Sequence, residues 1–185
     1  LRATPNLNNW RPADLVETAI SWRNAVTSED TPTCLIFSRQ NTSVLSRNPD
    51  QIDAIEKGGY LIKETSEPQL TIIASGSEVQ LAIDASGELE KQNIRANVVS
   101  MPCLDIFLNQ SEEYQLSVLG KNIPTLAVEM AHPDSWYKLL NKSDKVLGIK
   151  SFGESAPAND LLEHFGFTLP NVVSMAKSLL DEESS

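Results

Sequence analysis

The residue with the clearest potential for chemistry is Arg39, which directly follows Thr33 to Ser38, a largely apolar run with the length of a strand. Ligands of parallel sheets collect at the carboxyl ends of the strands, and an arginine at such an end can bind an anion. Its planar guanidinium suits a phosphate group, to which each charge-assisted hydrogen bond contributes about 1.5–3 kcal/mol. The alternative is a salt bridge at a domain edge to one of the 25 carboxylates of the chain.

Two serine motifs resemble sites of anion or acyl chemistry. Ser75-Gly76-Ser77 lies between a predicted strand and a predicted helix, where backbone N–H groups could hold an oxyanion. No glycine-rich phosphate-binding spacing accompanies it, so a helix cap is the simpler interpretation. Gly153-Glu154-Ser155-Ala156-Pro157 differs from the nucleophile elbow G-x-S-x-G by Pro157 at the second glycine. We therefore interpret Ser155 as a helix cap as well.

The histidines and cysteines are too few and too far apart for a metal site. His132 follows a predicted strand beside a carboxylate and two aromatic residues, and we expect it to cap a loop or pack on a ring. His164 follows Asp160 by four positions, which indicates a solvated contact on a helix. Cys34 and Cys103 are 69 positions apart, which is not zinc spacing, and both are expected to be reduced and buried.

The composition excludes several classes of protein. The chain has 185 residues, enough for one domain or for one domain plus part of another. With 15 basic and 25 acidic side chains its net charge is −10, which argues against a nucleic-acid-binding protein. No apolar run approaches the roughly 18–20 residues that cross a bilayer, and the first residues do not form a signal peptide. We expect a cytoplasmic protein that does not bind membranes.

The elements that must position Arg39 are a helix and a strand at the start of the chain. Pro12 and Asp14 favour a helix start, and the helix is predicted to end near Thr27. Its apolar residues recur on one face: Leu15, Ala19, Trp22 and Val26. The run Thr33 to Ser38 predicts a buried parallel strand. The polar stretch that follows, with Pro49, Gly58-Gly59 and Pro68, predicts a linker over residues 46–69.

Beyond the linker, strands and helices alternate. Leu70 to Ala74 predicts a strand, and Ser77 to about Gln92 a helix with a capping box formed by Ser77 and Gln80. Further strands are predicted at Ala96 to Ser100, Thr125 to Glu129 and Val146 to Ile149. The strand starts are 26, 29 and 21 residues apart, which is typical of βα units in an open, mainly parallel α/β sheet with flanking helices. Two short helices broken at Gly166 and Pro170 follow, and then a frayed acidic tail, 181–185.

Taken together and in order, these motifs resemble the transketolase family. The first part resembles the end of its pyrimidine-binding domain, in Arg2, Thr4-Pro5-Asn6, Trp10-Arg11-Pro12-Ala13-Asp14, Glu17, Trp22, Pro32-Thr33 and Ser38-Arg39-Gln40-Asn41. The rest resembles its carboxyl-terminal domain, in Gly58-Gly59-Tyr60, Ala74-Ser75-Gly76-Ser77-Glu78-Val79, Val98-Val99-Ser100-Met101-Pro102, Phe152-Gly153-Glu154-Ser155-Ala156-Pro157-Ala158, Phe165-Gly166-Phe167-Thr168 and Asn171-Val172-Val173. The resemblance implies a truncated pyrimidine-binding domain over 1–45, a linker over 46–69 and a carboxyl-terminal α/β domain over 70–180. The first domain would retain only its last helix and strand.

The resemblance also implies an activity. Transketolases of the pentose phosphate pathway use thiamine diphosphate, with a divalent metal such as Mg²⁺ or Ca²⁺, to transfer a two-carbon ketol unit between sugar phosphates, and they are homodimers. The arginine of the family's Ser-Arg-Gln motif contacts the substrate phosphate, and that role falls on Arg39. In the family, the residues that catalyse the reaction and those that bind the cofactor and the metal belong to the part of the protein upstream of Leu1. We therefore expect no catalytic, cofactor or metal site within this chain, no binding of the cofactor by this chain, and no activity of the chain alone.

Two alternatives to this interpretation remain, one from a different class of protein and one within the enzyme class. The chain could be a non-catalytic dimerisation or binding module that uses the same α/β domain. It could also belong to a related thiamine-diphosphate enzyme, such as a deoxyxylulose-phosphate synthase or a ketoacid dehydrogenase β subunit. The run Ser38-Arg39-Gln40-Asn41 after the predicted strand favours transketolase.

Overall fold

The computed structural model describes residues 1–183. The strands are β1 (Asn8–Trp10), β2 (Thr33–Leu35), β3 (Tyr60–Lys63), β4 (Leu70–Ala74), β5 (Ala96–Ser100), β6 (Thr125–Val128) and β7 (Lys145–Leu147). The α-helices are α1 (Leu15–Thr27), α2 (Pro49–Ala54), α3 (Glu78–Glu90), α4 (Leu104–Leu108), α5 (Glu112–Leu119), α6 (Ala158–His164) and α7 (Leu169–Glu183), and the 3₁₀ helices are η1 (Ile55–Lys57) and η2 (Pro133–Lys138). Within residues 1–183, no helix combines the length and the apolar character needed to cross a bilayer.

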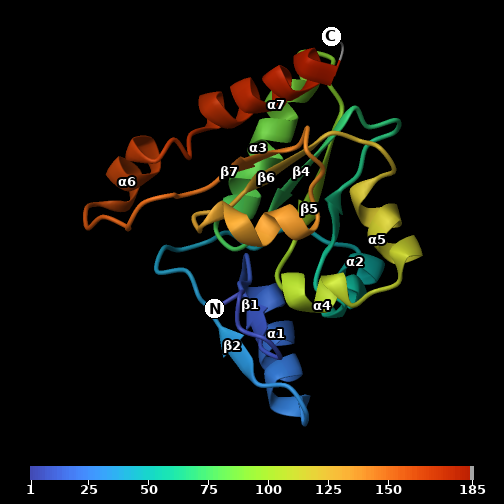
Figure 1. The fold of residues 1–185 in the computed structure, drawn as a ribbon, viewed down its shortest axis with the longest axis vertical. Helices are drawn as coiled ribbons and strands as arrows, with labels where there is room; N and C mark the ends of the chain where they lie inside the picture. Colours follow the sequence, from blue (N-terminus) through green and yellow to red (C-terminus); the bar gives the residue numbers. More distant parts are fainter. Residues whose placement is uncertain (184–185) are drawn as a thin grey trace.

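Five strands form one sheet in the order β3-β5-β4-β6-β7 (Figure 1). The pairs β4–β5, β4–β6 and β6–β7 are parallel, and β3 lies antiparallel to β5 at the edge. The predicted open, mainly parallel α/β sheet with flanking helices is therefore confirmed. Strands β4, β5 and β6 are buried along their whole length, as expected of strands covered on both faces.

The core has two halves, one on each face of the sheet. Successive residues of a strand point to opposite faces, so Ile72 and Ile73 of β4 belong to different clusters. The Ile72 cluster includes Val79 of α3 and Val172 of α7, and the two helices pack on each other. The Ile73 cluster includes Phe107 of α4 together with residues of α5 and η2. The sheet is thus held between two helical layers.

The predicted first helix is confirmed, but its predicted apolar face is not the buried one. Asp14 caps α1 by accepting a hydrogen bond from Glu17 N at 3.1 Å. Glu17, Ile20 and Ser21 are buried, whereas Trp22 is 52% exposed. Leu15 and Val26 are exposed as well. The polar side of α1 is buried because it carries the hydrogen bonds to the larger sheet that are described below, and this directs the apolar side outward.

Strand β2 is shorter and less buried than predicted. It spans Thr33–Leu35 rather than continuing to Ser38, and among residues 1–183 it pairs only with β1, in parallel. Its residues are half-buried, and Phe37 beyond it is 45% exposed and stacks on Trp22 at 6.2 Å between ring centroids. A strand with one neighbour has one unpaired edge, which explains why β2 lacks the cover of a central strand.

The stretch predicted as a linker contains regular structure. Helix α2 and η1 occupy residues 49–57, and β3 joins the sheet. Gly58 ends η1 in the left-handed conformation, with φ +83°, so the glycine pair that indicated a linker instead makes a turn into a strand. Tyr60 is buried against β5. The division of the chain into domains at residues 45 and 70 remains a prediction.

Three smaller expectations differ from the structure. Ser77 lies at the start of α3, but its backbone is helical and its side chain makes no capping bond, so the predicted capping box is absent. Pro170 does not divide the last segment, because it lies in the first turn of α7, where proline is tolerated. Helix α7 also continues through Glu183, so the predicted fraying of the tail is wrong for 181–183. Residues 184 and 185 of that tail lie outside the described part.

Candidate functional site

The sheet has a topological switch point at the carboxyl ends of β4 and β6. The chain passes from β4 through α3 to β5 on one side and later returns to β6 on the other side. Ser75 follows β4 and Glu129 follows β6, so both residues lie at this crevice. In open α/β sheets such a crevice is the usual place for a ligand.

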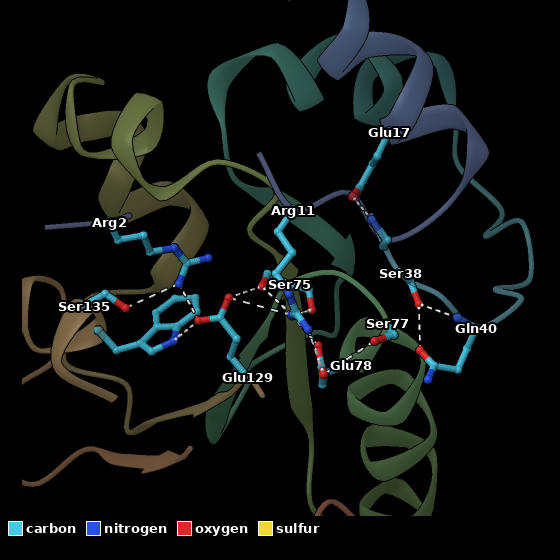
Figure 2. Close-up of polar contacts among 12 residues, drawn as sticks. Arg2, Arg11, Glu17, Ser38, Gln40, Ser75, Ser77, Glu78, Glu129 and Ser135 are labelled. Carbon is cyan, nitrogen blue, oxygen red and sulfur yellow. Dashed lines mark hydrogen bonds and ion pairs between the residues drawn. The ribbon is translucent and has the colours of Figure 1, made fainter. Parts of the chain in front are cut away.

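Here the crevice is filled by Arg11, which precedes α1 (Figure 2). Arg11 Nη1 donates to Ser75 O at 2.6 Å and to Ser75 Oγ at 3.0 Å. Its Nη2 donates to Glu78 Oε1 at 3.0 Å, and Nη1 makes a short contact with Glu78 Oε2. The guanidinium therefore binds Glu78 with both branches, the geometry in which arginine and carboxylate pair best.

A second arginine, Arg2, enters the crevice from the chain's first residues (Figure 2). Arg2 Nη1 pairs with Glu129 Oε2, which also accepts from Trp136 Nε1 at 2.9 Å. The other oxygen of Glu129 accepts from Ser75 Oγ at 2.6 Å and lies 3.7 Å from Arg11 Nη1. Two arginines thus face two buried carboxylates.

This arrangement of charges keeps Arg11 protonated. Burial opposes the charge of Arg11, but the hydrogen bond and charge of Glu78 and the charge of Glu129 outweigh it and raise the pKa of the guanidinium. Arg11 therefore stays charged and paired. Glu129 pairs with Arg2 and Glu78 with Arg11, so these two guanidinium groups are not free to bind an anion in the crevice.

Arg39 lies nearby in a different setting. It lines a cavity of about 280 Å³ whose wall includes Arg11, Gly76, Ser77 and Met130. Arg39 is exposed, and within residues 1–183 its guanidinium makes no ion pair. The salt-bridge alternative considered for Arg39 is therefore not observed in this part of the chain. An unpaired arginine in an open cavity retains its full capacity to bind an anion.

The turn that carries Arg39 is held by its two neighbours (Figure 2). Gln40 N donates to Ser38 Oγ at 3.2 Å, and Ser38 Oγ donates to Gln40 Oε1 at 3.1 Å. These bonds bring Ser38 and Gln40 together on either side of Arg39. Ser38 and Gln40 therefore both have a local structural role, which is to hold the turn that carries Arg39.

The other residues considered for chemistry are not assembled into a site. Ser75 is fully buried between Arg11 and Glu129, and Gly76 N donates to Arg11 O at 2.9 Å, so neither the Ser75 hydroxyl nor Gly76 N is free to bind an oxyanion. Ser155 is exposed in the loop before α6 and does not serve as its cap, which is Pro157. Its predicted capping role is therefore wrong.

The histidines lie on the surface and apart from Arg39. His132 is exposed and pairs with Asp134 at 3.3 Å, and it does not line the Arg39 cavity. His164 contacts Phe165 edge to face, with 4.8 Å between ring centroids, and within residues 1–183 its side chain forms no hydrogen bond or ion pair with the side chain of Asp160. No group of three or more His, Cys, Asp or Glu within residues 1–183 is arranged to hold a metal ion.

Both cysteines are free thiols, but only Cys103 is fully buried, and Cys34 is half-buried. Burial raises the pKa of the Cys103 thiol to about 12, so almost none of it is thiolate at neutral pH. We expect iodoacetamide at pH 8 to modify Cys34 alone in the folded chain and both cysteines in urea. Peptide mass spectrometry of the alkylated chain measures this, and equal labelling rates for the two folded thiols would contradict it.

A second buried network joins α1 to the sheet. Glu17 Oε1 accepts from Tyr60 OH at 2.7 Å, from Ser100 Oγ at 2.7 Å and from Arg47 Nη2 at 3.2 Å. Arg47 also pairs with Asp14 at 2.7 Å, and its side chain is 1% exposed. Burial opposes the charge of Arg47, but Asp14, Tyr60 and Glu17 outweigh it and raise its pKa. Burial and the charge of Glu17 also raise the pKa of Tyr60, so its phenol keeps the proton that it donates.

The sequence analysis did not single out either network. One signal was available: Glu129 directly follows a buried strand, and a carboxylate there needs a partner. The partner could not be identified, because Arg2 is 127 positions away in the chain. Arg11 gave a second signal, because it lies between Trp10 and Pro12 in a segment with no other charged residue and therefore has no local ion-pair partner.

These features define a class: a doubly wound α/β domain whose ligand crevice is occupied by arginines from a preceding, smaller α/β unit. The family described as the transketolase-like TK C-terminal domain matches residues 58–168, which is more than half of the chain. The chain therefore belongs to the transketolase family, as the sequence analysis predicted.

Relatives and solved structures agree. Transketolase 2 of Vibrio parahaemolyticus and transketolase 1 of Escherichia coli are each 46% identical over 182 residues, 97% of this chain and 28% of theirs. A crystal structure of a Pichia stipitis transketolase in complex with sedoheptulose-7-phosphate superposes with a TM-score of 0.92, at 39% identity, over 99% of this chain and 26% of that one. A transketolase from Leishmania mexicana gives a TM-score of 0.91 at 40% identity, over 98% of this chain and 26% of that one. The chain thus spans little more than a quarter of these relatives.

Proposed function

We propose that the chain is the carboxyl-terminal part of a transketolase that transfers a two-carbon ketol unit between sugar phosphates, and that Arg39 binds the phosphate of the substrate. The observation that carries the proposal is the unpaired guanidinium of Arg39, lining an open cavity at the end of the segment that follows β2. A phosphate offers the oxygens that a guanidinium binds best. The Pichia stipitis structure described as a complex with sedoheptulose-7-phosphate supports a sugar phosphate as the substrate class.

The cofactor would be bound outside this chain. Thiamine diphosphate, held with Mg²⁺ or Ca²⁺, supplies the carbanion chemistry of ketol transfer in the family. Residues 1–183 contain no cluster of metal ligands and therefore do not fit the metal, so we assign no step of the reaction on the cofactor to them. By the same family resemblance we propose a homodimer in the cytoplasm, and we expect no activity from the 185-residue chain alone.

The part of the chain that contains β1, α1 and β2 exposes an apolar surface, and this supports a larger parent protein. Leu15, Trp22 and Val26 of α1 and Phe37 after β2 are between 45% and 77% exposed. A two-stranded sheet such as β1–β2 is only marginally stable without further cover. Contiguous exposed apolar residues are typical of an interface, here with the remainder of the pyrimidine-binding domain. A non-catalytic binding module would use the same surface for a partner, and the Arg39 experiment separates the two.

The experiment is the substitution Arg39→Ala in the longer protein that contains this chain. Loss of the phosphate contact, about 1.5–3 kcal/mol, is expected to lower kcat/KM for a ketose phosphate by about 10- to 150-fold. The corresponding free ketose, which has no phosphate to lose, should be used almost as well as before. Steady-state kinetics with the two donors measures both values.

Arg23→Ala is the matched control, because Arg23 of α1 forms an exposed ion pair with Glu56 of η1. Arg23→Ala should leave kcat/KM nearly unchanged for both donors. An equal loss for both donors in Arg39→Ala would mean that Arg39 supports the fold rather than the phosphate. Absence of any ketol transfer by the longer protein would favour the binding module.

A further inference from the structure

The segment that leads to Arg39 is anchored to the larger domain at two neighbouring residues: Arg11, and Asn9 of β1, whose N and Nδ2 donate to Asp105 Oδ2 at 3.0 and 3.1 Å. Arg11 N donates to Pro102 O at 2.7 Å, and Arg11 O accepts from Gly76 N at 2.9 Å. The backbone of Arg11 is thus fixed to the loops that follow β5 and β4. Its side chain is fixed to Ser75 and Glu78 in the crevice beside the same loops (Figure 2).

Within residues 1–183, strand β2 makes no hydrogen bond to the larger sheet, although it packs on α1, which Glu17 joins to that sheet. It is held by parallel pairing with β1, in which Trp10 lies opposite Leu35, and by the bond from Ile36 N to Trp10 O at 2.8 Å. Trp10 directly precedes Arg11, and Arg39 follows Ile36 by three residues. One path from the larger sheet to Arg39 therefore runs through Arg11, then β1, then β2, beside the second attachment of β1 through Asn9 and Asp105.

We propose that Arg11 is a positioning residue: its attachment in the crevice fixes β1 and β2, and thereby holds Arg39 at its place over the start of α3. Arg11 and Arg39 line the same cavity, so a shift of either changes its shape. The two arginines then have different tasks. Arg11 is neutralised by Glu78 and Glu129 and supports the structure, whereas Arg39 keeps its charge available for an anion.

Gly76 supplies an independent way to disturb the same attachment. Its φ is +59°, and a Cβ at this position would lie 2.9 Å from Cζ and Nη1 of Arg11. That distance is too short for a carbon next to a guanidinium. Gly76→Ala therefore displaces the Arg11 side chain without removing it.

Hydrogen–deuterium exchange of the 185-residue chain tests the proposal without an activity assay. In Arg11→Met, Arg11→Lys and Gly76→Ala we expect peptide 33–39 to exchange about tenfold faster or more, since charge-assisted bonds that hold the segment are lost. Peptides covering β4, β5 and β6 should keep the exchange of the unsubstituted chain. Arg23→Met is the control that removes an arginine from an exposed ion pair of the same unit, and it should leave 33–39 unchanged.

Each other outcome overturns the proposal. Unchanged exchange at 33–39 in the folded variants would mean that β1 and β2 hold Arg39 without Arg11. Loss of protection throughout β4, β5 and β6 in all three variants would mean that Arg11 supports the whole fold rather than this segment.

The positioning role of Arg11 also has a consequence for substrate binding, which rests on the proposed function. Kinetics of the longer protein tests this consequence separately. Arg11→Lys is expected to raise KM for a ketose phosphate by roughly tenfold while leaving KM for the free ketose nearly unchanged. Failure of Arg39→Ala to distinguish the two donors would refute the proposed function. If Arg39→Ala distinguishes them and Arg11→Lys does not, the function stands and the positioning role of Arg11 is refuted.

Discussion

Replacing Glu17 by alanine is expected to lower the free energy of unfolding of the chain by about 3–5 kcal/mol, because the loss of one member of a buried ionic network leaves its partners uncompensated. Glu17 is fully buried and accepts four hydrogen bonds. Two of the donors, Ser100 Oγ and Ala13 N, have no second acceptor within residues 1–183. Each buried donor left unpaired costs about 1–3 kcal/mol.

The measurement is urea unfolding of the 185-residue chain followed by circular dichroism. The matched control is Glu56→Ala, which removes a carboxylate whose ion pair with Arg23 is exposed at both ends and is expected to cost less than about 1 kcal/mol. Glu17→Gln should fall between them, because it keeps one acceptor but loses the charge that faces Arg47. Equal losses for the Glu17 and Glu56 variants would show that the network does not hold α1 to the sheet.

The Glu17 network also explains which parts of the fold the sequence could predict. The start of α1 follows from Asp14 and the parallel strands follow from apolar runs, and both are signals within a few residues. The buried face of α1 depends on partners 30, 43 and 83 positions from Glu17, in Arg47, Tyr60 and Ser100. Helical periodicity therefore identified the apolar face of α1 correctly, but it did not reveal that this face is exposed.

The candidate site divides in the same way. The proposal for Arg39 could be made from the sequence because it depends on the residue's place after a predicted strand, and within residues 1–183 its guanidinium has no ion-pair partner that would change the interpretation. The role of Arg11 could not be predicted, because it depends on Glu78 at 67 positions and on the order of strands that creates the crevice. A residue that binds a small ligand can be found from local sequence more easily than one that joins two parts of the fold.

Gly58→Ala is expected to destabilise the chain by about 2–5 kcal/mol, the sum of a left-handed backbone penalty of about 1–2 kcal/mol and overpacking of about 1–3 kcal/mol. Gly58 has φ +83°, and a Cβ there would lie against Cys103 O and 2.7 Å from Phe107 N. Both atoms belong to the backbone, one in the N-cap of α4 and one within that helix, and the backbone cannot move aside as a flexible side chain would. Gly58 O also accepts from Cys103 N at 2.9 Å, so the close approach is part of the hydrogen-bonded structure.

Gly87→Ala is the matched control, because it makes the same chemical change in the middle of α3, where an added Cβ meets nothing within 4 Å. Alanine suits a helix better than glycine, so this variant should be more stable by up to about 1 kcal/mol. Urea unfolding of both variants gives the two free energies. Opposite signs would show that Gly58 holds β3 against the sheet through a close backbone contact, as the structure requires. Similar values would indicate that residues 46–69 behave as the flexible linker their composition suggested, since a linker accommodates alanine without a clash.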